Sequence, residues 1–330
     1  MLNKDAHLSV KVFADDIPAA PTRDGFGTGA VEAGKADPRV VVLCADLSES
    51  TRAEWFEKEF PERFIEMGVA EQNMATVASG MAAAGKIPFT ASYAVFNPGR
   101  NYEQIRTTIA INQMPVKICG MHAGVSVGPD GATHQMLEDI GMMRMLPHMT
   151  VIAPGDAEEA RKAVVAAAAT TTPVYLRFGR TATPTFTTPA TPFQIGKALL
   201  LWDCEHPQLA LISTGSLSYQ ALQAARALAE DGVDSVVLHV PTIKPLDTEA
   251  VLAAARQAGR VITVEEHQAA GGFGSAVTEF LAEHHPVPVK ILGVRDQFGQ
   301  SGIPEELLAH YGLDARSIEA AARAFITKNI

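Results

Sequence analysis

The sequence predicts an α/β protein with two domains, each a mostly parallel sheet with helices on both faces. Two observations predict it: short apolar runs alternate with segments of helical periodicity, and one Thr/Pro-rich stretch interrupts this alternation. We therefore expect a loose N-terminal arm at 1–20, a first domain at 21–180, a linker at 181–193 and a second domain at 194–330. Ligands of such sheets bind beyond the carboxyl ends of the strands.

The first domain repeats a strand-then-helix order from Val40 onward. Val69, Asn73 and Val77 recur at the spacing of one helix face, whereas Val40–Ala45 is apolar throughout, as in a strand that is buried on both sides. The expected strands are Val40–Ala45, Phe64–Ile65, Ile87–Ser92, Val116–Met121, Val151–Ala153 and Val174–Phe178, and the expected helices are Ala53–Phe60, Val69–Ala84, Pro98–Gln113, Leu137–Met145 and Ala157–Ala169.

The second domain repeats this order on a smaller scale. Leu217, Ala221 and Leu228 fall on one side of a helix between two apolar strands. The expected strands are Leu209–Ser213, Ser235–Val240, Val261–Glu265 and Val289–Leu292, with a further helix after Gly271–Gly274.

Composition excludes several classes of partner and location. The chain has 330 residues, 47% hydrophobic and 19% charged, and a formal net charge of −10 without a basic block, so neither nucleic acid nor an anionic membrane is an expected partner. Met1–Asp15 lacks the apolar region of a secretion signal, and no later apolar stretch is long enough to span a membrane. Cys44, Cys119 and Cys204 lie far apart in apolar segments, which indicates reduced thiols and a cytoplasmic location.

Familiar glycine and histidine motifs do not decide the function. Neither Gly25–Gly29 nor Gly271–Gly274 gives the G-x-G-x-x-G pattern between a strand and a helix, and the sequence lacks a P-loop and a nucleophile elbow. His122 and His134 have no cysteine or third histidine at ligand spacing, so we expect no metal site on this chain.

Two clusters at predicted strand ends carry the candidate chemistry. Glu71 falls in the first turn of the helix after Phe64–Ile65, in surroundings expected to be largely apolar. Taken alone, such an acid is more simply a partner for the helix dipole. The second cluster, His122–Gln135, follows a strand, carries two histidines and an aspartate, and is too polar for the core.

Together, the two clusters resemble the transketolase family. The resemblance rests on Gly68–Met74, the aromatic stretch at 89–96, Tyr102–Arg106 and His122–Gln135, in this order, and 194–330 resembles the C-terminal domain of transketolases. It implies that the first domain is a pyrimidine-binding domain and that the cofactor is thiamine diphosphate.

The resemblance also implies roles for single residues. Glu71 matches the glutamate that hydrogen-bonds N1′ of the cofactor's aminopyrimidine and exchanges a proton with it, which requires a carboxyl group rather than an amide. Tyr93 and Phe96 match the aromatic pocket around that ring, and Asp46 matches an aspartate near the cofactor. Guanidinium and imidazole groups suit the phosphate and hydroxyls of a sugar phosphate. The residues that match the channel for this substrate are Arg23, Ser50, His122, Asp130, His134 and Arg180, and the resemblance counts His122 and His134 as catalytic.

The sequence departs from the family in three respects. Gly99 stands where some relatives have a third aromatic residue, and Ala132 replaces a common proline, which puts the pocket shape in doubt. The Gly-Asp-Gly segment with which an N-terminal transketolase domain holds diphosphate and metal is absent, and Gly155–Ala157 does not match it. The chain therefore resembles the small subunit of a split transketolase, with Mg²⁺ or Ca²⁺ held by the partner chain.

The implied reaction transfers a two-carbon ketol unit from a ketose phosphate to an aldose phosphate, as in pentose phosphate metabolism. The implied enzyme is an α2β2 heterotetramer that is active only with its partner subunit. Two other enzymes are kept as alternatives: a ketolase for a branched or sulfonated sugar, and the β subunit of a 2-oxoacid dehydrogenase E1 component, which the His122–His134 loop disfavours. A non-catalytic regulatory subunit that keeps the fold is the alternative from a different class.

Overall fold

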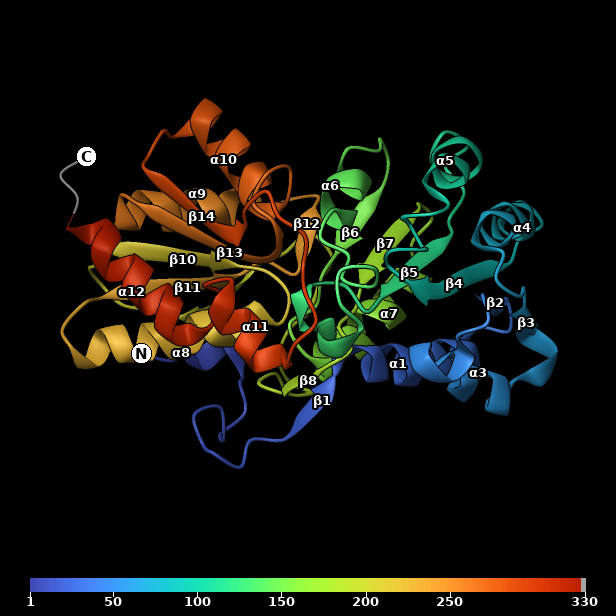
Figure 1. Cartoon of the computed structure of the whole chain (residues 1–330), viewed down its shortest axis with the longest axis horizontal. Coiled ribbons are helices and arrows are strands. Elements are labelled where there is room, and N and C mark those ends of the chain that lie inside the picture. The colour runs from blue at the N-terminus through green and yellow to red at the C-terminus, as the bar shows by residue number, and fades with distance from the viewer. Residues whose placement is uncertain (328–330) are drawn as a thin grey trace.

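The first domain is built on one sheet with helices on both faces, in a computed structural model that describes residues 1–327 (Figure 1). Its strands are β2 (Val40–Cys44), β3 (Phe64–Glu66), β4 (Ile87–Tyr93), β5 (Lys117–Met121), β6 (Thr150–Ile152), β7 (Val174–Arg177) and, from later in the chain, β12 (Thr242–Lys244). They follow the order β12-β6-β7-β5-β4-β2-β3, antiparallel only between β12 and β6. The helices are α1 (Thr22–Ala36), α2 (Ser48–Thr51), α3 (Ala53–Glu59), α4 (Glu71–Ala83), α5 (Tyr102–Gln104), α6 (Asp139–Arg144) and α7 (Ala157–Ala168), and a π-helical segment, Ile105–Ala110, extends α5.

The second domain repeats the architecture around a smaller sheet. Its strands are β9 (Leu199–Trp202), β10 (Leu209–Ser213), β11 (Ser235–His239), β13 (Val261–Gln268) and β14 (Val289–Val294). They follow the order β14-β13-β10-β11-β9, antiparallel only at β9. The helices are α8 (Leu217–Glu230), α9 (Thr248–Ala258), α10 (Phe273–His284), α11 (Pro304–His310) and α12 (Ala315–Ile326). The predicted fold class is thus confirmed.

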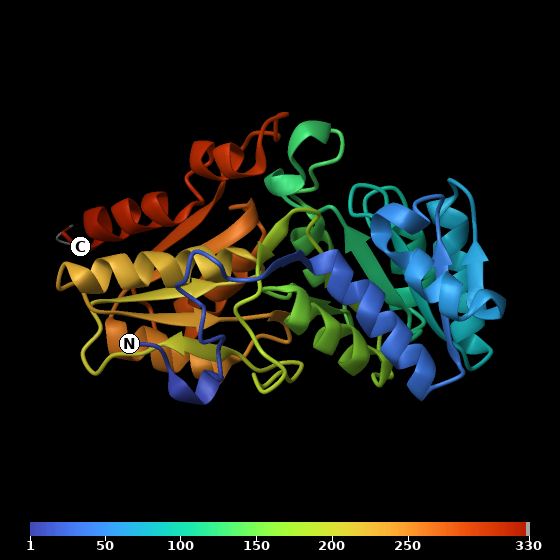
Figure 2. The ribbon, with the colours of Figure 1, turned by 90° about the horizontal axis from the view of Figure 1, so that it is seen from below.

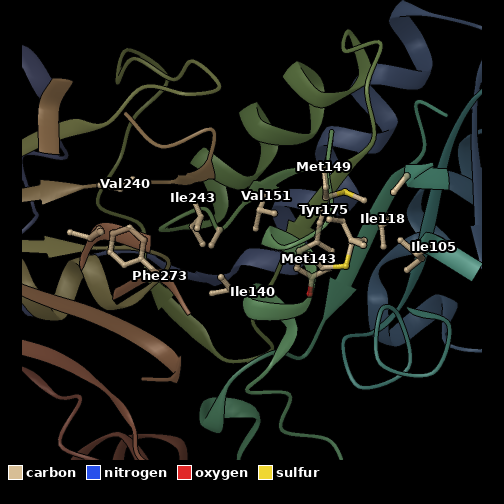
Figure 3. Packing of buried hydrophobic residues seen from close by; sticks show 14 of the residues in the cluster. Ile105, Ile118, Ile140, Met143, Met149, Val151, Tyr175, Val240, Ile243 and Phe273 are labelled. Carbon is tan, nitrogen blue, oxygen red and sulfur yellow. The ribbon is translucent and has the colours of Figure 1, made fainter. Parts of the chain in front are cut away.

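The apolar core continues from the first domain into the second. Ile118 and Tyr175 of the first sheet, Ile140 of α6, Ile243 of β12 and Phe273 of α10 belong to one buried cluster (Figure 3). Because β12 hydrogen-bonds to β6, the second half of the chain also completes the first sheet. The two domains are therefore joined by backbone pairing as well as by apolar contact.

Glycines in α1 allow close packing against α7, beside which it runs (Figure 2). A Cβ at Gly25 would lie 2.2 Å from the carbonyl oxygen of Ala157, and a Cβ at Gly29 would lie 2.8 Å from that of Arg161. The glycine-rich segment that fails the dinucleotide pattern therefore serves helix packing.

The N-terminal arm is not loose, contrary to the expectation. The N–H of Asn3 donates to the carbonyl of Leu201 at 2.9 Å, and Val12 is buried in the core of the second domain. Strand β1 (Ala19–Pro21) pairs with β8 (Ala182–Pro184), which lies in the expected linker. The arm was misjudged because its partners lie far along the chain.

Candidate functional site

A cavity of about 430 Å³ lies beyond the carboxyl ends of the parallel strands of the first sheet. The start of α1, the segment after β2 and the segment after β7 form its walls. Its lining residues are Arg23, Asp46, Leu47, Ser48, Glu49, Ser50, Arg52 and Arg180.

Glu71 is the first residue of α4, as predicted, and its side chain is only 1% exposed. Its Oε1 accepts a hydrogen bond from the Ser92 hydroxyl at 3.2 Å, and its Oε2 accepts one from Nη1 of Arg100 at 2.6 Å. The Asn101 amide donates to the backbone carbonyl of Glu71 at 3.0 Å. The expectation of largely apolar surroundings is therefore wrong, because the buried carboxylate has a cation and a hydroxyl as partners.

The predicted aromatic pair and both predicted histidines form one stack of rings. The rings of Tyr93 and Phe96 stack with centroids 6.0 Å apart, and His122 stacks on Tyr93 at 3.9 Å. His134 meets both aromatic rings edge-on, at 5.9 and 5.8 Å. The guanidinium of Arg100 lies over Phe96, 4.4 Å from its centroid, and the same group binds Glu71. Arg100 therefore connects the ring stack to the buried carboxylate.

His122 is buried among cations and carries one defined tautomer. Its Nε2 lies 3.4 Å from Nη1 of Arg23, and because a guanidinium only donates, the imidazole proton belongs on Nδ1. Burial, then Arg23 and Arg180, lower the pKa of His122 to about 3. Nδ1 is buried without a hydrogen-bond partner among the described residues. An oxygen of a bound molecule would satisfy this donor.

Ser50 and Arg23 connect the ring stack to the cavity. The Ser50 hydroxyl lies 2.7 Å from the Tyr93 hydroxyl, and Nη1 of Arg23 donates to the Ser50 carbonyl at 2.7 Å. Nη1 of Arg180 donates to the carbonyl of Val127 at 2.9 Å. Three of the predicted substrate residues, Arg23, Ser50 and Arg180, thus line one cavity.

The two predicted acids other than Glu71 lie at the periphery. Asp46 is exposed at the cavity and has a left-handed backbone, with φ of 57°, that is held by a 2.8 Å hydrogen bond from its N–H to Oε1 of Glu66. Asp130 is exposed at the end of a 3-10 segment, and within residues 1–327 no hydrogen bond or ion pair joins it to the other predicted site residues. The structure therefore does not bring Asp130 into the cluster.

Arg100, which pairs with Glu71, is not among the site residues that the sequence predicts. The expected helix Pro98–Gln113 would have placed Arg100 within it, but the helix begins at Tyr102 and Arg100 lies in the preceding turn. A Cβ at Gly99 would lie 2.1 Å from the carbonyl oxygen of Val95, so no third aromatic residue fits there without rearrangement. The Asn-Pro-Gly sequence just before Arg100 was the signal for this turn.

Residues 1–327 contain no group of three or more His, Cys, Asp or Glu side chains that could hold a metal ion. In the same part of the chain, no helix is long and apolar enough to cross a membrane.

Family models match almost the whole chain. The model of the transketolase pyrimidine-binding domain matches residues 19–185, and that of the transketolase C-terminal domain matches residues 196–318. The chain belongs to the transketolase family. Its family membership confirms the resemblance, and dependence on thiamine diphosphate is what this family implies.

Curated transketolase relatives include separate subunits of nearly the same length. A subunit of the apulose-4-phosphate transketolase of Phocaeicola vulgatus is 39% identical over 307 residues, which are 93% of this chain and 97% of that protein. The 6-deoxy-6-sulfo-D-fructose transketolase subunit SqwH of a Clostridium species is 39% identical over 300 residues, which are 91% of this chain and 92% of that protein. The first of these names contains a sugar phosphate, and the second contains a sulfo sugar.

A solved transketolase structure has the same fold. It is described as a split gene transketolase in an inactive beta4 tetramer, and it superposes with a TM-score of 0.86 at 43% sequence identity. The match covers 93% of this chain and 98% of that one.

The residues around Glu71 have the chemistry to hold an aminopyrimidine ring. Glu71 offers a buried carboxylate, and Tyr93 and Phe96 offer ring surfaces. Arg100 already donates to Oε2 of Glu71, so a ring that binds this carboxylate would share it with Arg100 or displace Arg100.

Proposed function

We propose that this chain is the small subunit of a two-chain transketolase that forms its active site together with a partner chain. One observation carries the proposal: Glu71 begins helix α4, and its carboxylate is buried near the stacked rings of Tyr93 and Phe96. The names of the near-full-length relatives, which are subunits of transketolases, support a separate partner.

Thiamine diphosphate would bind between the first domain of this chain and the partner. Glu71 would accept and return a proton at the ring nitrogen, Tyr93 and Phe96 would enclose the ring, and Asp46 would lie near the cofactor. The cofactor supplies the carbon nucleophile that cleaves the ketose. The partner chain would hold the diphosphate through Mg²⁺ or Ca²⁺.

The substrates would be a ketose phosphate and an aldose phosphate. The guanidinium groups of Arg23 and Arg180 would bind the phosphate, together with Ser50, because these groups line one polar cavity. His122 and His134 would contact sugar hydroxyls from the ring stack. Asp130, which is exposed and lies outside this cluster, would contact the same sugar.

The assembly would be an α2β2 heterotetramer. A shared active site requires an obligate interface, on the order of 2,000 Å² or more. Val69 lies two residues before Glu71 and is 68% exposed, so apolar surface is available next to the site.

The location would be cytoplasmic. The three cysteines are free, as is usual in a reducing compartment.

Reconstitution tests the proposal. We expect ketol transfer from a panel of ketose phosphates only when this chain is mixed with a Gly-Asp-Gly-type partner, thiamine diphosphate and Mg²⁺. Ketol transfer by this chain alone would contradict the shared site, and oxidative decarboxylation of a 2-oxo acid without ketol transfer would indicate a dehydrogenase subunit instead. A cofactor that left the thermal stability of the complex unchanged would indicate a non-catalytic subunit.

A further inference from the structure

Three guanidinium groups line the cavity at the carboxyl end of the first sheet. Arg23 comes from the first turn of α1, Arg52 joins α2 to α3, and Arg180 follows β7. Arg23 and Arg180 are predicted to bind a sugar phosphate, whereas no role is predicted for Arg52. The position of Arg52 therefore requires an explanation.

Arg52 is fixed from three sides. Its Nε donates to Oδ1 of Asp24 at 2.7 Å, its Nη1 donates to the carbonyl of Glu49 at 3.1 Å, and its guanidinium lies 5.7 Å from the centroid of a Trp55 ring. Gly27 permits this arrangement, because a Cβ there would lie 2.9 Å from Cβ of Arg52. A side chain held in this way loses little further entropy when it binds a ligand.

The backbone of Arg52 is in a conformation that arginine rarely adopts. With φ of 69° and ψ of 11°, it closes α2 and precedes the first residue of α3. Glycine or asparagine normally occupies such a left-handed position after a helix. A strained backbone that carries a fixed, charged side chain at a cavity is typical of a functional site.

Arg23 and Arg180 have no ion-pair partner among residues 1–327, whereas Arg52 pairs with Asp24. The carboxylates of Asp46 and Glu49 also line the cavity, but neither forms an ion pair with its arginines. Burial, and then the charge of Arg52, lower the pKa of Arg23. An anion bound in the cavity that these three groups line would relieve this repulsion.

We propose that Arg52 is the third guanidinium of the substrate's anion site and that the site thereby selects a dianionic phosphate over a monoanionic sulfonate. This inference rests on the proposed function and decides between two of its substrate classes. A phosphate monoester carries a charge of about −1.5 to −2 at neutral pH and three acceptor oxygens. A sulfonate has a similar shape but a single charge, so each guanidinium attracts it less.

The comparison of two donors tests the proposal in the reconstituted enzyme. The wild type is expected to have a kcat/KM roughly tenfold or more higher for a ketose phosphate than for its sulfonate isostere. Arg52→Met is expected to raise KM for the phosphate roughly tenfold with kcat nearly unchanged, and to change KM for the sulfonate much less. Arg52→Lys keeps the positive charge but loses the planar guanidinium with its paired donors. Its KM for the phosphate is expected to lie between those of the wild type and Arg52→Met. Arg39→Met, which removes an exposed arginine paired with Asp37, is the matched control and is expected to change neither donor.

A binding measurement makes the test independent of turnover. Methyl phosphate and methanesulfonate are titrated into the full chain at pH 7.5, and the thermal midpoint of unfolding is followed. The wild type is expected to be stabilised more by methyl phosphate, and Arg52→Met is expected to lose most of this difference. A wild type without preference for methyl phosphate, or an Arg52→Met variant that keeps the preference, would overturn the proposal. If neither sugar donor reacts with any partner chain, the proposed function fails, and the two small anions still decide the role of Arg52.

Discussion

The guanidinium of Arg100 lies 2.6 Å from Oε2 of Glu71 and also covers the ring of Phe96. Glu71 is 1% exposed and Arg100 is 42% exposed, so one end of the ion pair is buried and the other reaches solvent. The arrangement explains how a carboxylate can remain in a buried position before the cofactor is present.

Removal of Arg100 should therefore destabilise the isolated chain. Arg100→Met leaves the buried Glu71 without its cation, and we expect a loss of about 1–2 kcal/mol in the free energy of unfolding. This is less than for a fully buried pair because Arg100 is partly solvated. Urea titration measures the loss. Arg106→Met, which removes a nearby exposed arginine, should cost less than about 0.5 kcal/mol. Equal effects of the two variants would show that the Arg100–Glu71 pair contributes no stability.

His122 should stay neutral over the whole range in which exposed histidines titrate. Its pKa of about 3 lies below the ordinary value of 6.5, because burial and then Arg23 disfavour the imidazolium. Nitrogen-detected NMR of the isolated chain should show the proton on Nδ1 and no change of this ring between pH 8 and 5. Since the unfolded histidine binds a proton below about pH 6.5, His122 should make the fold less stable as pH falls from there toward 3. A ring that titrates near pH 6.5 would contradict this environment.

Glu265 should make stability depend on pH in the opposite direction. Burial raises its pKa to about 7 from an ordinary 4.5, although the N–H groups of Phe273 and Gly274 donate to it. Between these values the folded chain binds a proton that the unfolded chain has lost, so its contribution falls as pH rises from 4.5 through 7. Glu265→Gln should remove roughly 3 kcal/mol of the wild type's stability difference between pH 4.5 and 8. Identical pH profiles for variant and wild type would contradict the raised pKa.

Two glycine-to-alanine substitutions should act in opposite directions. At Gly25 a Cβ would lie 2.2 Å from the carbonyl oxygen of Ala157, so Gly25→Ala should push α1 from α7 and cost about 1–3 kcal/mol. At Gly80, inside α4, nothing lies within 4 Å of the added Cβ, so Gly80→Ala should stabilise the chain by about 0.5–1 kcal/mol. Thermal unfolding of the isolated chain measures both. A Gly25→Ala variant as stable as the wild type would show that α1 and α7 can separate without cost.

The long apolar strands could be predicted from the sequence. Val40–Ala45 and Val116–Met121 became β2 and β5 within one residue at either end, because strands buried on both faces are apolar without interruption. Helix α1 was not predicted, because its glycines lower helix propensity and only its contact with α7 gives them a purpose. Strand β12 is too short to recognise, since its register depends on β6, which lies far away in the sequence.

The candidate site was predictable as a set of residues but not as a set of contacts. Tyr93 ends β4, Phe96 follows β4, and His122 and His134 follow β5 at the same edge of the sheet, so their rings meet in one ring stack. The pair between Glu71 and Arg100 was missed, because a turn at Gly99 and not a helical spacing brings them together.

The activity of Glu71→Gln in the reconstituted two-chain enzyme tests the central claim most directly. An amide keeps the shape and the partners Ser92 and Arg100 but cannot accept and return a proton, so kcat should fall by about 10² to 10⁴, equivalent to about 3–5 kcal/mol. Glu103→Gln, the same change at an exposed position of α5, should leave kcat unchanged. If Glu71→Gln assembles with the partner, melts within a few degrees of the wild type and turns over at a near-normal rate, Glu71 does not exchange the proton and the account is contradicted.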